Sequence, residues 1–183
     1  MKLYTKLNGF ATALLGVFVL LGCSSTQSLQ EYYVDNSENP NFLAIDVPAN
    51  ILKLDEASLD ETQRTALKSL RKLNILVFQK TTENAKEYKQ ETAKVKEILK
   101  NSDFKDLMKL NTQYARGVVK YSGDGDAIDE VVIYGDSQDK GFGLIRVLGD
   151  DMNPAHFMQL MQAVQKADVD GEGFKELMGM LKG

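Results

Sequence analysis

Hydrophobic positions recur with two different periods along the chain, and each period predicts one type of secondary structure. Between residues 82 and 100 apolar side chains return every three or four positions while Lys and Glu fill the others, which predicts an amphipathic helix. Ser58 and Glu61 have the spacing of a capping box, so a second helix is predicted to start at Ser58 and run to about Arg71. A third is predicted from Pro154, because proline suits the first helical position.

Compact apolar runs and alternating segments predict the strands. Residues 74–79 form an apolar run that is typical of a buried strand, and residues 42–47 form a short extended segment that ends before Pro48. Four segments with a period of two follow in close succession: 104–110, 117–121, 128–134 and 142–148. Their spacing favours an antiparallel meander. The predicted fold is α+β: an antiparallel β-meander sheet with a strand–helix crossover and helices packed on one face.

The first residues have the pattern of a secretory signal. Lys2 and Lys6 precede an apolar stretch, residues 10–21, which is shorter than the roughly 18 residues of a membrane-spanning helix. The sequence Leu20-Leu21-Gly22-Cys23 that follows resembles the lipobox of bacterial lipoproteins. That resemblance implies cleavage between Gly22 and Cys23, a diacylglycerol on the Cys23 thiol and acylation of its amine, for example by palmitate. The alternative, a chance cysteine in a signal anchor or a soluble export signal, leaves the lone cysteine without a role.

These features divide the chain into three parts. Residues 1–22 are predicted to be the signal peptide, residues 23–40 a polar lipidated tether, and residues 41–183 a single α+β domain. Several acyl chains give a stable membrane anchor where one gives only marginal binding. The residue after the cysteine is Ser24 rather than Asp, which fits sorting to the outer membrane, and no acidic run follows it. We therefore expect an envelope protein, anchored by lipid in the outer membrane, that faces the periplasm.

The charge and amino-acid composition argue against two classes of function, nucleic-acid binding and enzymatic catalysis. The formal net charge is −4, and removal of residues 1–22, which hold two lysines and no acidic residue, makes it −6. This acidic balance argues against nucleic acid as a partner. With 43% hydrophobic residues the chain can build an ordinary core, but one His (His156), one Cys and no Trp supply few groups for a metal centre or a nucleophile. We expect neither enzymatic activity nor a cofactor.

Two acidic loops are the candidates for a metal site. Residues 124–130 contain four carboxylates, but they do not follow the ligand spacing of a calcium loop, and Gly with Asp suits a hairpin turn. Asp168, Asp170 and Glu172 are the better candidate. The twelfth position of that loop is Gly179 instead of the closing Glu, which favours a linker between two helices.

The last helix is the candidate for partner binding. Phe174, Leu177, Met178 and Leu181 follow the i, i+3, i+4, i+7 spacing of one helix face. A helix this short is unstable alone in water. Its apolar side chains must therefore pack on their own domain or on another molecule, which is either a protein partner or a second copy of the chain. Five of the seven methionines lie in the last 32 residues of the chain, where they can fill a core or line an adaptable partner groove.

Parts of the sequence also resemble a known protein family. The lipobox, the strand Ile75-Leu76-Val77-Phe78, the stretch from Asp103 to Met108 and the segment from Phe142 to Gly149 resemble small lipoproteins of Bacteroidetes bacteria grouped as domain of unknown function 4252. The resemblance covers roughly residues 42–164. It implies an envelope lipoprotein with an α+β domain, and it implies no activity, cofactor or site residues.

Two functions remain open from the sequence. The first is a membrane-anchored envelope lipoprotein with a non-catalytic binding or structural domain, motivated by the anchor and by the few catalytic groups. The alternative is a carboxylate-based site, binding a Ca²⁺-like metal or serving hydrolysis, at one of the two acidic loops.

Overall fold

The computed structural model describes residues 27–51, 56–111, 115–125 and 127–166. In chain order the helices and strands are α2 (Leu29–Asn36), β1 (Phe42–Pro48), the 3₁₀ turns η1 (Ala49–Ile51) and η2 (Glu56–Ser58), α3 (Glu61–Ser69), β2 (Leu70–Gln79), α4 (Ala85–Ile98), β3 (Lys105–Asn111), β4 (Arg116–Asp124), β5 (Ala127–Ser137), β6 (Gly141–Met152) and α5 (Pro154–Lys166).

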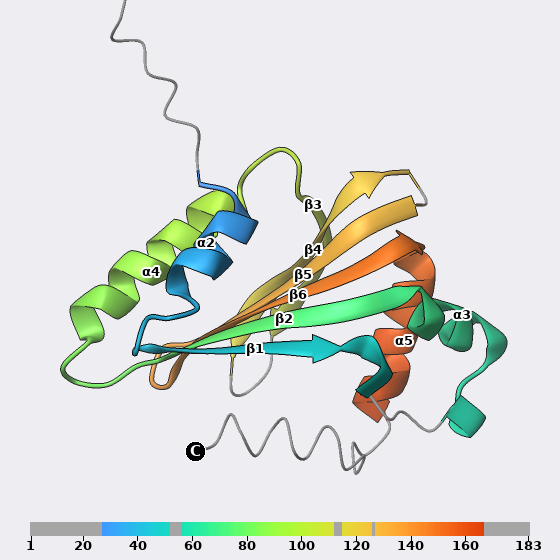
Figure 1. The fold of residues 1–183 in the computed structure, drawn as a ribbon, viewed down its shortest axis with the longest axis horizontal. Helices are drawn as coiled ribbons and strands as arrows, with labels where there is room; N and C mark the ends of the chain where they lie inside the picture. The colour runs from blue at the N-terminus through green and yellow to red at the C-terminus, as the bar shows by residue number, and fades with distance from the viewer. Residues whose placement is uncertain (1–26, 52–55, 112–114, 126, 167–183) are drawn as a thin grey trace, which may run out of the picture.

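The six strands form one open antiparallel sheet in the order β1-β2-β6-β5-β4-β3 (Figure 1). Strands β3 to β6 lie next to one another in chain order, which confirms the predicted meander. Strand β6 also pairs with β2, so the meander and the β1–β2 pair form one continuous sheet. Helix α4 connects β2 to β3 at the far edge of the sheet, as the predicted crossover requires. The α+β class is confirmed.

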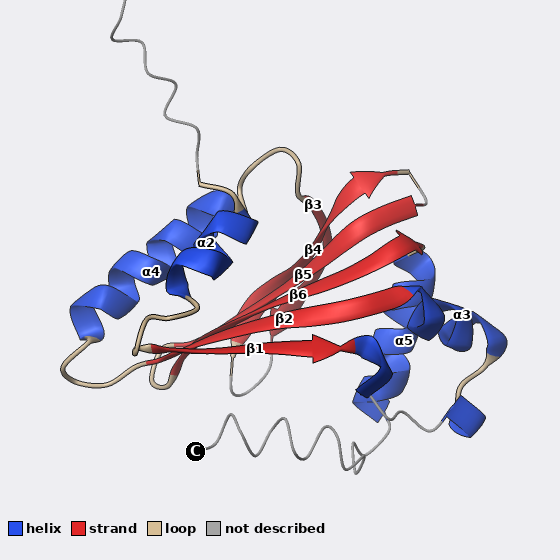
Figure 2. Ribbon diagram, viewed as in Figure 1, coloured by secondary structure: helices blue, strands red, loops and turns tan. Residues whose placement is uncertain are grey.

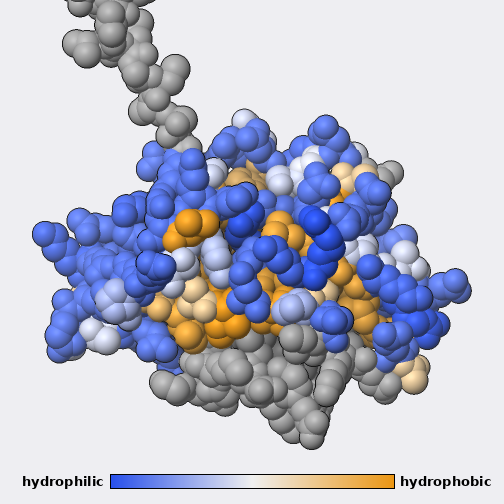
Figure 3. Space-filling view, in the orientation of Figure 1, coloured by the Kyte–Doolittle hydropathy of each residue, from blue (hydrophilic) through white to orange (hydrophobic). Residues whose placement is uncertain are grey.

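The helices occupy both faces of the sheet, where the sequence predicted only one (Figure 2). Helices α2 and α4 pack on the face that carries Leu76, Phe78 and Leu144. Helix α5 packs through Phe157 on the opposite face, and α3 packs against α5. The physical reason lies in the central strands β2, β5 and β6, where consecutive residues are buried, so that each face needs its own cover. Hydrophobic residues form a band between the hydrophilic surfaces of the helices (Figure 3).

Aromatic rings form the core beneath α2 and α4. Phe78 of β2 stacks on Phe142 of β6 with 5.6 Å between ring centroids, and Phe42 of β1 meets Phe78 edge to face at 5.0 Å. Tyr32 of α2 closes the group, with its ring 6.3 Å from Phe42. Offset and edge-to-face pairs of this kind add to the stabilisation that burial gives. The aromatic group therefore ties the edge strand, the central strands and α2 together.

Helix α2 corrects the predicted tether of residues 23–40. Leu29 and Tyr32 are buried in the core, so residues 29–36 belong to the domain. Ser28 and Glu31 form a full capping box, in which the Glu31 amide donates to Ser28 Oγ at 3.2 Å and the Ser28 amide donates to the Glu31 carboxylate at 2.8 Å. The segment was predicted to be a tether because most of its residues are polar. Its capping box and the two apolar residues on one helix face, Leu29 and Tyr32, instead indicate a short helix.

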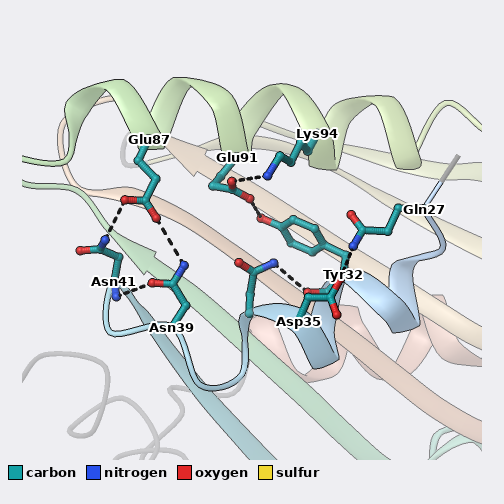
Figure 4. Close-up of polar contacts among 9 residues, drawn as sticks. Gln27, Tyr32, Asp35, Asn39, Asn41, Glu87, Glu91 and Lys94 are labelled. Carbon is teal, nitrogen blue, oxygen red and sulfur yellow. Dashed lines mark hydrogen bonds and ion pairs between the residues drawn. The ribbon is translucent and has the colours of Figure 1, made fainter.

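Polar contacts to α4 hold the same segment in place (Figure 4). Asn39 and Asn41, in the loop after α2, donate hydrogen bonds of 3.3 and 2.8 Å to the Glu87 carboxylate of α4. Each of these two asparagines thus ties the loop to one carboxylate oxygen of the long helix. The loop before β1 is therefore an ordered part of the domain, held to α4 by these hydrogen bonds.

The start and end of α3 also differ from prediction. Asp60, not Ser58, is the N-cap, and its carboxylate accepts a hydrogen bond of 2.8 Å from the Gln63 amide. The Gln63 side-chain oxygen in turn accepts a hydrogen bond of 3.0 Å from the Asp60 amide. The capping box therefore lies two residues later than predicted. The helix ends at Ser69 because Leu70 already belongs to β2.

Candidate binding groove

An open groove lies between helix α4 and strands β3 to β5. Its volume is about 1100 Å³. Most of its polar groups come from three places: the C-terminal part of α4 with the residues just after it, strand β4 and the end of β5. The lining side chains with charged or hydroxyl groups are Lys96, Lys100, Asp106, Arg116, Lys120, Tyr134, Asp136, Ser137 and Asp139.

Asp136 organises one wall of the groove. Its carboxylate accepts a hydrogen bond from the Tyr88 hydroxyl and forms an ion pair with Lys96 Nζ at 3.3 Å. Tyr88 and Lys96 both come from α4, so this carboxylate fastens the helix to β5. Burial, and then the neighbouring carboxylate, raise the pKa of Tyr88 to about 12. The Tyr88 side chain therefore remains a neutral hydrogen-bond donor throughout the ordinary pH range.

Tyr134 lies in the same wall with an unused hydroxyl. Its side chain is 3% exposed, and its hydroxyl has no hydrogen-bond partner among the described residues. Burial, and then the nearby Asp136 carboxylate, raise the pKa of this phenol above its ordinary value. The Thr92 hydroxyl of α4 is likewise buried without a partner. A buried polar group without a partner costs about 1–3 kcal/mol, so a polar group that reached either hydroxyl would relieve that cost.

The positive charge that lines the groove is only partly neutralised. Lys120 of β4 pairs with Asp106 of β3 at 2.5 Å. Lys100 and Arg116, in contrast, have no ion-pair partner in the described part of the chain. Among the described residues, the groove is therefore lined by two cations without an ion-pair partner and by one phenol whose hydroxyl has no hydrogen-bond partner. Such donors suit an anionic oxygen group such as a carboxylate or a phosphate.

A second polar set lies on the same face of the sheet, but its groups satisfy one another. Arg146 of β6 donates from Nε to Glu130 of β5 at 2.6 Å, and both side chains are mostly buried. On β1, Asp46 accepts hydrogen bonds from Tyr33, at 2.7 Å, and from Asn74. Because these partners are already paired, we interpret this set as structural.

The acidic segment 124–130 lies where β4 ends at Asp124 and β5 begins at Ala127, and these two residues pair across the hairpin. Gly125 has φ +61°, the conformation that the turn interpretation requires. Asp124 and Asp129 are exposed, while Glu130 turns away to Arg146. Across the described ranges, no group of three His, Cys, Asp or Glu side chains could hold a metal ion. His156 lies half-buried near the start of α5, where its amide donates to the Asn153 side chain at 3.1 Å.

The other predicted site residues lie outside the described residues. These are the cleavage and lipidation positions Gly22 and Cys23, the acidic candidates Asp168, Asp170 and Glu172, and the apolar candidates Phe174, Leu177, Met178 and Leu181. In the part of the chain that the structure describes, no helix is long and apolar enough to cross a membrane.

Sequence reasoning missed the groove. Tyr134 and Asp136 are two positions apart in a strand, so the alternation alone places both on one face of the sheet. Lys96 and Lys100 are one helical turn apart, which also predicts a shared face. The packing of α4 beside β5 brings Lys96 to Asp136, and this tertiary contact could not be predicted from the sequence. Without that contact the lysines resemble the solvated face of an amphipathic helix.

Fold and groove together define an α+β domain with an open antiparallel sheet, helices on both faces and a charged groove beside the long helix. The chain belongs to the family described as Domain of unknown function (DUF4252), whose model matches residues 32–160. The match begins inside α2, in agreement with the place of that helix in the domain. No curated protein and no solved structure matches the chain.

Proposed function

We propose that this protein is a lipid-anchored protein of the bacterial envelope whose domain is a binding module rather than an enzyme. The sequence Leu20-Leu21-Gly22-Cys23 after a short apolar stretch supports the anchor, with Cys23 as the lipidated residue. Ser24 supports the outer membrane and a domain that faces the periplasm. The partners in this proposal are the membrane, through the acyl chains, and a protein partner or a second copy through the domain. Nucleic acid is not among them.

The groove is the binding surface in this proposal, and its ligand carries an anionic oxygen group. The observation that carries this is the buried Tyr134 hydroxyl, which has no partner in the described residues and lies in a groove with the unpaired Lys100 and Arg116. A carboxylate or phosphate would accept from the phenol and from a guanidinium at once. Because the protein as a whole is acidic, this local excess of cations stands out from the rest of its charge.

The test uses phosphate and acetate as probes. Either ion is titrated at constant ionic strength into the ¹⁵N-labelled full chain in detergent, and amide shifts are followed. We expect saturable shifts at the Lys100, Arg116 and Tyr134 amides with one or both probes, and the stronger probe identifies the anion type. Arg116→Glu should abolish them. Lys86→Glu is the matched control, because Lys86 is an exposed α4 lysine outside the groove.

Two outcomes would contradict the proposal. If neither probe gives a saturable shift in the groove, the unpaired donors do not form a binding site. If Arg116→Glu and Lys86→Glu weaken the shifts equally, the effect is the general charge of the surface and not recognition in the groove. Tyr134→Phe separates the contributions further, because it removes the phenol hydroxyl while leaving every cation in place.

A further inference from the structure

A row of glycines crosses the face of the sheet that lies opposite α2 and α4. Gly143 of β6 pairs with Gly135 of β5, and Gly135 pairs with Gly117 of β4. At the two ends of this row lie Val77, the partner of Gly143, and Leu110, the partner of Gly117. Three neighbouring strands therefore carry no side chain at this level. The β5 backbone fills the space beside Gly117, so the shallow trough lies over Gly143 and Gly135, next to Val77.

The neighbouring rows show that the trough is part of an apolar face. One row nearer α5, the paired residues are Ile45, Ile75, Ile145 and Ile133. The row after that holds Val147 and Val131, which α5 covers through Phe157. Ile45, Ile145 and Ile133 remain partly exposed, as does Val77. The cover over this face therefore becomes incomplete at the isoleucine row, where Ile75 is buried but the other three isoleucines are not, and towards the trough.

The trough has room for incoming side chains. A methyl group built on Gly143 would meet nothing within 4 Å, and one on Gly135 would meet only the Ala115 side chain at 4.0 Å. A cavity of about 500 Å³ extends over this end of the sheet and is lined in part by Val77, Gly135 and Gly143. Glycines allow a packed element to approach a backbone closely. The face thus suits a short helix with large apolar side chains.

The chain itself carries a segment of this kind. After α5, which already lies on this face, the sequence continues through residues 167–183. Phe174, Leu177, Met178 and Leu181 have the sequence spacing of one helix face. The connecting residues 167–173 can span roughly 23 Å when extended. Strands lie about 4.8 Å apart, so this length covers several strands of the sheet.

We propose that residues 174–181 pack as a short amphipathic helix on the glycine row of their own domain. A tethered segment has an effective concentration in the millimolar range, which favours this occupant over a second copy at ordinary protein concentrations. The tertiary contact also supplies the stability that so short a helix lacks alone. Large side chains at positions 174 and 177 would fill the space that the absent side chains of Gly143 and Gly135 leave open.

Disulfide trapping tests the contact. The sequence has a single cysteine, so a Cys23→Ala background offers no other thiol. In the full chain in detergent, Val77→Cys is combined with Leu177→Cys, or with Glu176→Cys as the matched control on the other helix face. Mild oxidation should form the intramolecular disulfide several-fold faster for the Leu177 pair, because only that side chain points at Val77, and the product is seen as a faster band on a non-reducing gel. Equal rates for the two pairs would overturn the proposal, and disulfide-linked dimers would assign the face to a second copy.

Tryptophan fluorescence provides a second measurement, in which the reporter lies outside the sheet. The sequence has no Trp, so Leu177→Trp and Glu176→Trp each introduce a single reporter. Leu177→Trp should emit at shorter wavelength and be quenched several-fold less by acrylamide than Glu176→Trp. The difference should disappear when Gly135→Arg is added, because that side chain would occupy the trough. Identical emission and quenching of the two tryptophans would refute the packing even if the cysteine variants failed to fold.

Discussion

The Tyr32 hydroxyl donates a hydrogen bond of 2.9 Å to the carboxylate of Glu91, and both residues are buried (Figure 4). Lys94 donates to the other oxygen of the same carboxylate at 2.7 Å. The buried carboxylate of α4 therefore depends on a phenol from α2, which lies 59 residues earlier in the chain. This contact makes the helix next to the proposed lipid tether part of the domain core.

Tyr32→Phe is expected to lower the free energy of unfolding by about 1–3 kcal/mol, because it leaves one oxygen of a buried carboxylate without its donor. Urea unfolding followed by circular dichroism measures the loss. Tyr33→Phe is the matched control: it removes a hydroxyl that donates to the exposed Asp46, and we expect a smaller loss. Equal losses for the two variants would contradict a special role for the Tyr32–Glu91 contact.

The comparison of sequence and structure separates local signals from tertiary ones. The meander and α4 were predictable because residues 104–148 and 82–100 follow clear periods of two and of three to four. Helix α2 was missed although its capping box is visible at Ser28 and Glu31, because the polar composition of the segment outweighed that local signal. Its stability comes from the buried contacts of Leu29 and Tyr32 with distant strands, and no local pattern contains those contacts.

The candidate site was less predictable for the same reason. The pairing of Lys96 with Asp136 joins a helix to a strand 40 residues away, and the unused hydroxyl of Tyr134 follows from the packing of α4 above it. The glycine row could be located only from the register of β4, β5 and β6, because Gly117, Gly135 and Gly143 are scattered in the sequence. Register depends on the paired strands together, whereas periodicity belongs to one segment.

Stability should fall steeply at high pH. The folded state raises the pKa of Tyr88 from 10.0 to about 12, and it raises the pKa values of Tyr32 and Tyr134 as well, in each case through burial first. These phenols are neutral in both states below pH 10, so their contribution is fully present there. Above pH 10 the unfolded chain releases protons that the folded chain retains, so stability is lost as the pH rises toward 12 and beyond.

Urea midpoints measured between pH 8 and pH 11.5 test this expectation. The midpoint should be nearly constant to about pH 10 and then decrease, and absorbance at 295 nm should show the buried phenolates appearing only with unfolding. Tyr88→Phe should start from a lower stability at pH 8 but lose less of it above pH 10, because one of the linked protons is gone. If the urea midpoints of the wild-type protein and Tyr88→Phe decrease in parallel above pH 10, Tyr88 does not contribute to the loss of stability at high pH.

Lipidation makes a prediction about Cys23. In a bacterial host that processes lipoproteins, the chain should incorporate labelled palmitate and fractionate with membranes. Cys23→Ala should lose the label, because no other residue of the sequence offers a thiol, and should accumulate as an uncleaved or soluble species. Ser24→Ala is the control and should keep the label. Palmitate incorporation that persists in Cys23→Ala would place the anchor elsewhere.

The buried pair of Arg146 and Glu130 should respond strongly to the loss of one partner. Their side chains are 8% and 14% exposed, and the Nε–carboxylate distance is 2.6 Å. Glu130→Ala is expected to cost about 3–5 kcal/mol, because the guanidinium remains charged and buried without its counter-ion. The double variant Glu130→Leu with Arg146→Met should lose less than Glu130→Ala, since apolar side chains can replace a buried pair at little cost.

The exposed pair of Arg71 and Asp150 offers the comparison within the same sheet. Its side chains are 59% and 72% exposed at a distance of 3.2 Å, so Arg71→Met should change the free energy of unfolding by no more than about 1 kcal/mol. Urea unfolding of all variants at one pH and salt concentration gives the differences directly. If Glu130→Ala costs no more than Arg71→Met, water reaches Arg146, and the interpretation of the Arg146–Glu130 pair as a closed structural contact is wrong. That result would reopen this part of the sheet face as a second place where an anion could bind, because an unpaired guanidinium accessible to solvent is the group that the proposed groove offers at Arg116.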